Sequence, residues 1–582
     1  MSDLNLLRYY TRLTPLGVGE EIKTSLTDIS ELLFTSLRHA RNLMNQMHDM
    51  EWLAWSPQVG RNKRSSLVLN YDLVELKHHL ATKRITAGKY EKALAILDND
   101  ETEFGRLLQN TSGTSLREGR LHLQLTYKRS FERLVPHQLH RSSERYLMRQ
   151  IYCCLVQSNK RGQLCPQLAH HWQHDESATQ WSFYLRPGLT FHNGAAIDAD
   201  AIVSLFAKLS SLPEYQVELG HLSNVSAPNP LKVVFSLSKP DFGFGGLISG
   251  VRYSIQPTSQ VNNAQTLSVI GSGPFSVAEH SESRLKLQAF DRYYECRALT
   301  DEVSIWLFKE KDKQQLITTN QPGAGLDTGC NHFIAKEGEQ QHDSDIKHSH
   351  VEDGCMFVLF NQQSSSPTNL EQRRYLASLL SPEAIHHQLH QQGRLFGCEL
   401  AGNLLPIWHK VLRPFSQVAP LPKSLSIATY DYIAGINCAL CVQTLLETQG
   451  VEVEVNIYSY RDLVGKAQRK ELSEDLIITN INLDDNRHAS AFGSLFSNDV
   501  LHYAIGDQAQ QWLSESLESL RASTPLEEYL HALEPIACTL ISEHHLTPLF
   551  HHRQTLRFHG VLKDVALTNW GWPDIRNVWS TN

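Results

Sequence analysis

Apolar and polar residues alternate with the period of an α-helix in the first fifty positions of the chain. Leu6, Tyr9, Tyr10 and Leu13 recur at the i, i+3, i+4, i+7 spacing and predict one amphipathic helix. Ser25–Asp28 has the form of a capping box, which indicates the start of a second, short helix. We therefore expect two short helices ahead of a turn at about residue 35.

A third helix is expected at about 36–50, and its two faces differ in character. The apolar stripe that must pack inward consists of Ala40, Leu43, Met44 and Met47. The other side carries the candidate DNA contacts Ser36 (also the helix cap), Arg38, His39, Arg41, Asn42 and Asn45. Arginine can bond guanine and asparagine can bond adenine in the major groove, so this face is suited to a recognition helix.

Two apolar runs with a basic turn between them follow this helix. Trp52–Trp55 and Leu67–Leu69 predict strands, and the turn carries Arg61, Lys63 and Arg64, which can reach a phosphate backbone or a minor groove. A polar helix face or a basic turn alone is more often plain solvated surface. Their order and spacing together favour a winged helix-turn-helix, with double-stranded DNA as its partner.

The pattern changes twice along the rest of the chain. Residues 71–118 are polar and helical and indicate a connector, whereas Leu121–Tyr127 alternates like a strand. Strands and helices then alternate to the end, which predicts an α/β architecture. In one clear unit, the strands Leu425–Thr429 and Val451–Ile457 flank a helix through Cys438 to Leu446, so parallel pairing is expected.

Composition narrows the possible classes of protein. The 582 residues carry a net charge of -8, so contact with nucleic acid requires a local basic patch. The ten cysteines show no disulfide spacing, and Cys438 and Cys441 are expected to be core residues. The N-terminus lacks the pattern of a secretory leader and no window resembles a membrane span, so we expect a cytoplasmic protein.

The large C-terminal part contains a set of short motifs, which are Leu168–Trp172, Trp181–Gly194, Gly271–Phe275, Phe290–Tyr294 and Phe357–Asn361. Together these motifs resemble those of the family 5 extracellular solute-binding proteins of peptide and nickel importers. The resemblance covers residues from about 120 to 582. It implies two lobes joined by a hinge that close on a ligand.

Segments of both halves can be compared together: the wing Gly60–Ser65, the recognition segment Ser36–Met44 and the C-terminal Gly571–Asp574. These segments, and the combination of the two halves, resemble the SgrR family of sugar-phosphate-stress regulators. One departure is Leu37, which stands where related winged helices often have arginine. The resemblance implies a DNA-binding regulator that responds to a small-molecule effector, for which a sugar-related metabolite is a fair hypothesis. Activation and repression cannot be separated, and no heptad run indicates an oligomeric state.

The expected fold class is a multidomain α+β chain. A winged helix-turn-helix at 1–70 and a helical linker at 71–118 precede a sensor of the class II periplasmic-binding-protein type at 119–582. Within the sensor we expect lobe one at about 119–320 and 540–582, and lobe two at about 350–530.

The resemblance also points to candidate ligand contacts in the sensor. Trp570 and Trp572 are placed at the edge of the first lobe's cleft, and Asn361 ends a strand near the crossover. Asp484 or Asp485 falls where peptide binders carry an acidic anchor for a ligand amine. Because the rest of that anchor motif is not recognisable, a peptide ligand is in doubt.

Two other functional classes compete with a regulator. An enzyme is disfavoured because no nucleophile elbow, phosphate loop or dinucleotide fingerprint occurs in a suitable context. The histidine cluster Glu383, His386, His387 and His390 lacks a metal-binding framework, so neither metal nor cofactor is expected. The other class is a solute-binding protein that serves a transporter, or an intracellular solute-binding module without DNA binding.

Replacing Arg38 and Asn42 with Ala is expected to remove sequence preference, because base contacts of this kind each supply about 1–3 kcal/mol of discrimination. Replacing Arg61 and Lys63 with Ala should weaken binding to all DNA alike, because phosphate contacts carry no sequence information. Mobility-shift titrations of specific and random duplexes at one salt concentration measure both effects. Equal losses of specific and non-specific binding from both pairs of changes would contradict this division.

Overall fold

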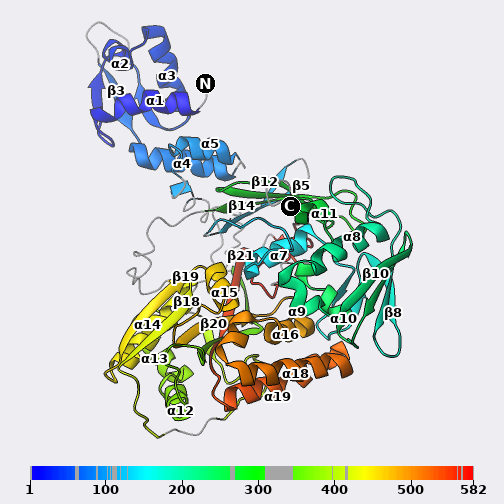
Figure 1. The fold of residues 1–582 in the computed structure, drawn as a ribbon. Coiled ribbons are helices and arrows are strands. Elements are labelled where there is room, and N and C mark those ends of the chain that lie inside the picture. Colours follow the sequence, from blue (N-terminus) through cyan, green and yellow to red (C-terminus); the bar gives the residue numbers. More distant parts are fainter. Residues whose placement is uncertain are drawn as a thin grey trace.

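A small N-terminal head is joined through a helical linker to a much larger two-lobed body (Figure 1). The computed structural model describes residues 3–580 except 59–63, 87–88, 101–102, 105–106, 108–113, 118–119, 128, 263–268, 308–344, 396, 413–416, 560–561, 565 and 567. None of the helices in these ranges is long and apolar enough to cross a bilayer.

The head contains the expected helices and wing. They are α1 (Asp3–Leu13), α2 (Leu26–Leu32), α3 (Leu37–Asp49) and the antiparallel strands β2 (Leu53–Ser56) and β3 (Ser65–Leu69). The predicted capping box is present, because Ser25 and Asp28 each accept the other's backbone N–H at 3.1 Å. Phe34 forms the turn before α3 in the left-handed region, with φ of 52°.

A third strand in the head was not predicted. β1 (Ile22–Thr24) pairs antiparallel with β3, with Ile22 opposite Leu67. Its three residues are too few to show an alternating pattern, so only the pairing with β3 identifies them as a strand.

The described part of the linker includes the helices α4 (Leu73–Thr86) and α5 (Tyr90–Ile96). Its buried side chains share one apolar cluster with those of the head, so head and linker pack as a continuous body. The predicted linker range also contains β4 (Thr114–Arg117), which pairs with β5 (Arg120–Tyr127) of the first sheet. The body's first sheet therefore begins inside the range expected to be linker.

Lobe one is built on two sheets. One has the order β12-β13-β14-β5-β4 and the other β10-β11-β9-β8. Its remaining strands are β6 (Val156–Ser158), β7 (Leu164–Pro166), β8 (Ala169–His174), β9 (Gln180–Leu185), β10 (Leu222–Asn229), β11 (Lys232–Leu237), β12 (Phe275–His280), β13 (Arg284–Ala289) and β14 (Thr300–Leu307). Its helices are α7 (Ser142–Ile151), α8 (Ala199–Ser210), α9 (Gln216–Leu219), α10 (Phe244–Ile248) and α11 (Thr258–Asn262).

Lobe two is built on a mixed sheet of order β15-β21-β16-β20-β18-β19, to which β17 adds at β21. Its strands are β15 (Asp345–Val351), β16 (Gly354–Phe360), β17 (Cys398–Leu400), β18 (Ser424–Tyr430), β19 (Glu452–Tyr458), β20 (Leu476–Asn482) and β21 (Leu546–His559). Its helices are α12 (Leu370–Leu379), α13 (Pro382–Gln391), α14 (Ile433–Glu447), α15 (Tyr460–Gln468), α16 (Arg487–Phe496), α17 (Asp499–Ala504), α18 (Asp507–Ser523) and α19 (Tyr529–Ser542). A short pair, β22 (Leu562–Lys563) and β23 (Trp579–Ser580), follows.

Two expectations for lobe two can be compared directly with this sheet. The predicted parallel unit is confirmed, since β18 and β19 pair in parallel and α14 connects them. The expected assignment of residues 540–559 to lobe one is wrong, because β21 pairs with β16 in the sheet of lobe two. Only the segment near Trp570, Trp572 and Ile575 packs into the core of lobe one.

The motif Gly271–Phe275 has a steric basis in lobe one. Gly271 and Gly273 lie against the end of α7, where an added Cβ would come within 2.0 Å of the Ile151 carbonyl oxygen and 2.6 Å of the Tyr152 nitrogen, respectively. A side chain at either position would therefore push the loop away from the helix.

Gly273→Ala is expected to lower the free energy of unfolding by about 1–3 kcal/mol, because the new methyl group overlaps backbone atoms. Gly465→Ala in α15 is the matched control, since its Cβ would meet only the Arg469 guanidinium, at 3.0 Å, on a side chain that is 60% exposed. The control should gain up to about 1 kcal/mol from helix propensity. Urea unfolding measures both, and equal midpoints for the two variants would refute the steric explanation.

Candidate DNA interface and interlobe site

Helix α3 presents the predicted recognition face to solvent. Its apolar stripe is fully buried, whereas Arg38, Arg41, Asn42 and Asn45 are exposed. The Ser36 hydroxyl accepts the His39 backbone N–H at 3.3 Å, so this serine caps the helix. The exposed side chains lie along the first three turns, which is the part of a recognition helix that reaches base edges.

His39 and the wing complete the predicted set of DNA contacts. His39 is half-buried and its ring lies edge-on to Tyr9 at 5.9 Å, so it helps to position α3 against α1. Arg64 is exposed immediately before β3, whereas Arg61 and Lys63 lie outside the described residues. The DNA-binding roles of all these residues remain predictions.

An apolar edge adjoins the recognition face. Phe34 is 83% exposed and Leu37 is 50% exposed, next to Arg38. The Arg12 guanidinium lies 5.3 Å from the centre of the Phe34 ring and donates a hydrogen bond to the Leu33 carbonyl. The turn into α3 is therefore held by a cation–π contact and a backbone contact from α1.

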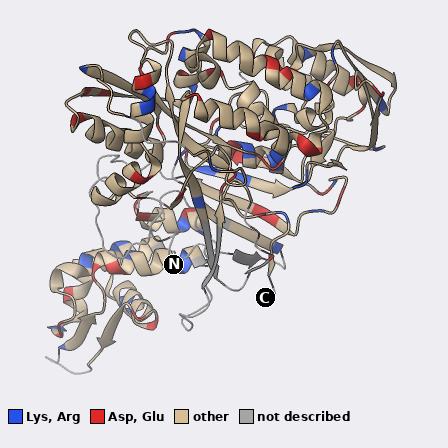
Figure 2. Ribbon diagram, turned by 90° about the horizontal axis from the view of Figure 1, so that it is seen from below, with Lys and Arg blue, Asp and Glu red and all other residues tan. Residues whose placement is uncertain are grey.

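Charge is mixed over the large body of the protein. Figure 2 shows acidic and basic residues interspersed along the ribbons of both lobes. With a net charge of -8, the chain has no overall attraction for a polyanion. Attraction to DNA must come from the local cations of the head.

Two arginines of helix α7 in lobe one, and the arginine at its N-cap, meet three acidic residues of lobe two. Arg145 and Arg149 are four residues apart and share one face of the helix, and Arg141 precedes them by the same interval. Their respective partners are Asp431, Asp484 and Asp485. These pairs, which we call the arginine row, join the lobes along the whole length of α7.

The central pair of the arginine row is the most enclosed. The Arg145 Nε donates to Asp484 Oδ1 at 2.6 Å, and the Trp570 indole N–H donates to the same oxygen at 3.0 Å. The side chains of Arg145 and Asp484 are only 21% and 13% exposed. A second guanidinium nitrogen of Arg145 donates to the Asn482 carbonyl at 3.1 Å, so lobe two contributes two acceptors to one arginine.

The third pair links α7 to the loop before α16. Arg149 Nη2 donates to Asp485 Oδ1 at 2.8 Å and to the Ser249 carbonyl at 2.7 Å. Burial lowers the pKa of the Arg149 guanidinium, but the charge of Asp485 outweighs this and leaves the pKa raised. Arg149 therefore stays charged inside the interface, where it needs an acidic partner.

The structure brings together three of the five predicted ligand contacts. Asp484, Asp485 and Trp570 meet at the arginine row, where arginines from lobe one bind both carboxylates. An acidic anchor at this place is therefore already neutralised by the chain's own side chains. Whether a ligand also contacts these residues remains a prediction.

Asn361 and Trp572 lie elsewhere and have structural contacts. The Asn361 amide donates to the carbonyls of Leu472 and Glu474, and its oxygen accepts the Gln363 N–H. Trp572 is fully buried and stacks on Tyr146 at 5.2 Å. Both side chains are buried and have structural contacts, and their assignment as ligand contacts remains a prediction.

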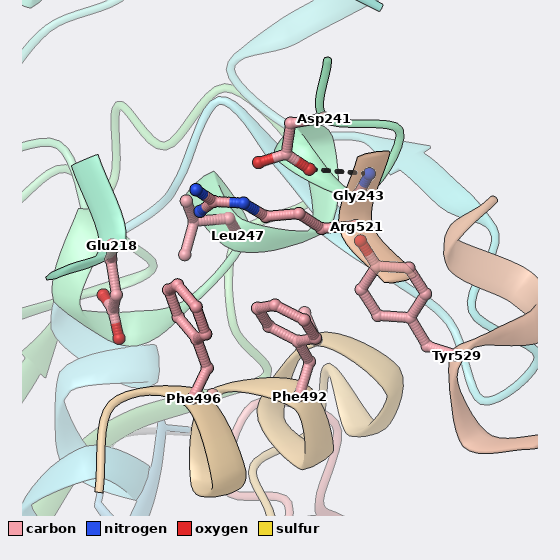
Figure 3. A pocket seen from close by; sticks show the side chains of 10 residues that line it. Glu218, Asp241, Gly243, Leu247, Phe492, Phe496, Arg521 and Tyr529 are labelled. Atoms are coloured by element: carbon pink, nitrogen blue, oxygen red, sulfur yellow. Dashed lines mark hydrogen bonds between the residues drawn. The ribbon is translucent and has the colours of Figure 1, made fainter. Parts of the chain in front are cut away.

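A small cavity that opens to solvent lies between the lobes next to α16 (Figure 3). Lobe one and lobe two both contribute to its walls, which are formed by Glu218, Asp241, Gly243, Leu247, Ala489, Phe492, Gly493, Phe496, Arg521 and Tyr529. None of these residues was singled out by sequence reasoning. The arginine row had a usable signal in its spacing of four residues, whereas the cavity depends on contacts between distant segments.

The paired cysteines of α14 are packed as expected. Cys438 and Cys441 are both buried, and burial raises the pKa of Cys441 to about 11. At neutral pH both thiols therefore stay protonated and unreactive.

Two family models match parts of the chain. The model described as "Sugar transport-related sRNA regulator N-term" matches residues 5–119, and the model "Bacterial extracellular solute-binding proteins, family 5 Middle" matches residues 163–368. The first match spans the head and the linker, and the second spans much of lobe one and the start of lobe two.

Similar full-length proteins carry the name "HTH-type transcriptional regulator SgrR". The protein from Yersinia pseudotuberculosis serotype I (strain IP32953) is 29% identical over 100% of this chain and 99% of its own length. The one from Shigella dysenteriae serotype 1 (strain Sd197) is 27% identical, again over 100% of this chain and 99% of its own.

The body also resembles solved structures. NikA from Brucella suis in complex with Fe(III)-EDTA has a TM-score of 0.61 and 14% identity, and 79% of this chain aligns with all of that protein. The oligopeptide-binding protein AppA from Bacillus subtilis has a TM-score of 0.61 and 16% identity over 79% of this chain and 99% of its own. These similarities confirm the expected two-lobed solute-binding fold.

Arg145→Met combined with Arg149→Met is expected to separate the lobes in a larger fraction of molecules. Removing one partner of a buried ion pair lowers stability by about 3–5 kcal/mol. The loss is smaller here because both pairs keep some solvent contact. Small-angle X-ray scattering should show an increased radius of gyration.

Arg461→Met is the matched control for the arginine row. Arg461 also pairs across the lobes, with Glu132 at 2.9 Å, but the two side chains are 64% and 50% exposed. Such a pair contributes about 0–1 kcal/mol, so the radius of gyration should stay unchanged. If the double variant scatters like this control, the arginine row does not hold the lobes together.

Proposed function

We propose that this chain, a member of the SgrR family of HTH-type transcriptional regulators, is a DNA-binding regulator controlled by a small molecule held between its lobes. The relatives are named as regulators over the full length of the chain, and the head has the geometry of a winged helix. The functional units of the proposal are a head at 1–70, a linker at 71–118 and a sensor at 119–582.

One observation carries the proposal, and it is the packing of the sensor's Trp306 into the apolar cluster of head and linker. Trp306 lies in β14 of lobe one and is only 5% exposed. Its ring contacts Tyr90 of α5 at 5.7 Å and Phe104 at 5.1 Å. A side chain from the sensor sheet is therefore part of the linker's own core.

Polar contacts reinforce the same junction. The Arg284 guanidinium of β13 lies 5.0 Å from the centre of the Trp306 ring and 3.9 Å from the Glu91 carboxylate of α5. On the other side of the linker, the Tyr10 hydroxyl of α1 donates to the Tyr71 carbonyl at 2.7 Å. A shift of the sensor sheet would thus be passed through the linker to the head.

The proposed mechanism uses the two states of the lobes. β5 pairs with β14 along its length, and the chain leads from β5 through Tyr127 to α7, which carries the arginine row. A ligand that binds closed lobes better than open ones shifts this equilibrium, and only that difference in affinity can alter the head.

The first experiment is a mobility-shift assay on DNA upstream of the chain's own gene and neighbouring genes, with random competitor at fixed salt. Selective retention is expected, and it should change when a small-molecule fraction of a cell extract is added. If selective DNA binding is absent both with and without the extract, the regulator proposal is overturned. The chain would then be a solute-binding module with another output.

Trp306→Ala is expected to leave operator binding intact but to abolish its response to the small-molecule fraction, because the sensor then loses its contact with the linker. Removing a buried tryptophan also costs about 3–5 kcal/mol, so unfolding must be measured alongside. Trp579→Ala is the control, since that side chain is 39% exposed in the short β22–β23 pair. A Trp306→Ala protein that is folded and still fully responsive would disprove this route.

A further inference from the structure

Two large apolar side chains are exposed at the start of the recognition helix α3. Phe34 is 83% exposed in the turn before the helix, and Leu37, the first residue of α3, is 50% exposed. They stand three positions apart in the sequence, directly before Arg38. We call these two residues the apolar edge. Apolar side chains that are rimmed by polar residues on a protein surface mark an interaction site.

The turn itself does not favour an aromatic residue at Phe34. Its φ is 52°, in the left-handed region that glycine or asparagine adopts with less strain. The Arg12 guanidinium of α1 lies 5.3 Å from the centre of the ring and also donates to the Leu33 carbonyl at 2.6 Å. The ring is therefore held in place on the surface, outside the buried core of the head. Strained residues that their surroundings hold in one position are concentrated at binding surfaces.

Leu37 lies at the margin of the exposed face of α3, one helical turn before Arg41. Ser36 caps the helix by accepting the His39 N–H, so α3 begins at Leu37 with a fixed direction. Arg38 and Arg41 are exposed, and their charges attract DNA phosphates. When α3 enters the major groove, its first turn lies against the base edges. Leu37 is therefore placed within reach of the bases.

The apolar group that the major groove presents is the 5-methyl group of thymine. The other groups that distinguish bases in this groove are hydrogen-bond donors and acceptors, and a leucine that covers one of them leaves it unsatisfied. Asn42 of α3 is exposed and suited to bind adenine, whose paired thymine brings its methyl group into the same groove. An apolar edge beside such an asparagine therefore favours A·T pairs.

We propose that the apolar edge of Phe34 and Leu37 binds thymine methyl groups in the major groove. Leu37 packs on the methyl group nearest the start of α3, and the Phe34 ring covers a neighbouring one. Because leucine has no donor, it cannot bond guanine as an arginine would at the same position. The inference rests on the proposed function and deepens it by naming a feature of the DNA that the head reads.

Uracil tests this contact directly, because it pairs with adenine through the same hydrogen bonds but lacks the 5-methyl group. The full-length protein is titrated by mobility shift against the duplex that it retains most selectively, and against versions in which each thymine in turn is replaced by uracil. Affinity should fall about fourfold at each contacted thymine, since one buried methyl group is lost, and should stay unchanged at the others. Equal affinity for the thymine duplex and a fully uracil-substituted duplex would overturn the proposal.

Leu37→Ala and Phe34→Ala assign the methyl groups to individual side chains. Each variant should bind the thymine duplex about fourfold more weakly and should no longer respond to uracil at one position. Leu231→Ala is the matched control, because Leu231 is similarly exposed, at 42%, but lies in lobe one beside β11. If both head variants respond to uracil as the wild-type protein does, other side chains contact the methyl groups and the proposal is wrong.

A second copy of the chain is the other occupant that this edge could have. Sedimentation velocity would then show wild-type dimers that either head variant converts to monomers, with thymine and uracil duplexes bound alike, and this outcome would overturn the proposal. Absence of any selective DNA binding would remove the regulator together with this inference. Selective binding that does not respond to uracil would remove the inference alone and leave the regulator standing.

Discussion

The arrangement of the lobes depends on the three arginines of the arginine row, each of which pairs with an acidic residue of the other lobe. Arg145 and Arg149 are mostly removed from water, and a buried charge without a partner is far more costly than any single apolar contact is favourable. Their pairing with Asp484 and Asp485 sets how lobe two sits against α7. The small cavity beside α16 also has walls from both lobes, so it too depends on how the lobes meet.

The same contact is connected to the DNA-binding head through ordinary packing. Helix α7 belongs to the apolar core that contains β5 and β14, and Trp306 extends from β14 into the core of the linker. A packed interior transmits small displacements because it has few voids to absorb them. The closed lobes, the linker and the recognition helix are therefore connected by continuous packing. A ligand that binds between the lobes can shift the equilibrium between the conformations of this connected body.

Much of the head could be predicted because its determinants are local. The capping box at Ser25 and Asp28, the apolar stripe of α3 and the wing strands each follow from residues a few positions apart. Strand β1 was missed because three residues carry no pattern of their own. In the body, the local β18–α14–β19 unit was predicted, whereas β21 was placed in the wrong lobe because its partner β16 is nearly two hundred residues away.

The sequence by itself determined the local elements, the likeness to a known family and the residues exposed on α3, because these depend on periodicity and capping over short spans. It also placed Asp484, Asp485 and Trp570 among residues of interest, without showing that Arg145 and Arg149 bind the two aspartates. Only the tertiary structure decided those pairings, the burial of Trp306 in the linker and the position of Arg521 between the lobes. Each joins segments far apart in the chain, and such contacts leave no periodic trace in the sequence.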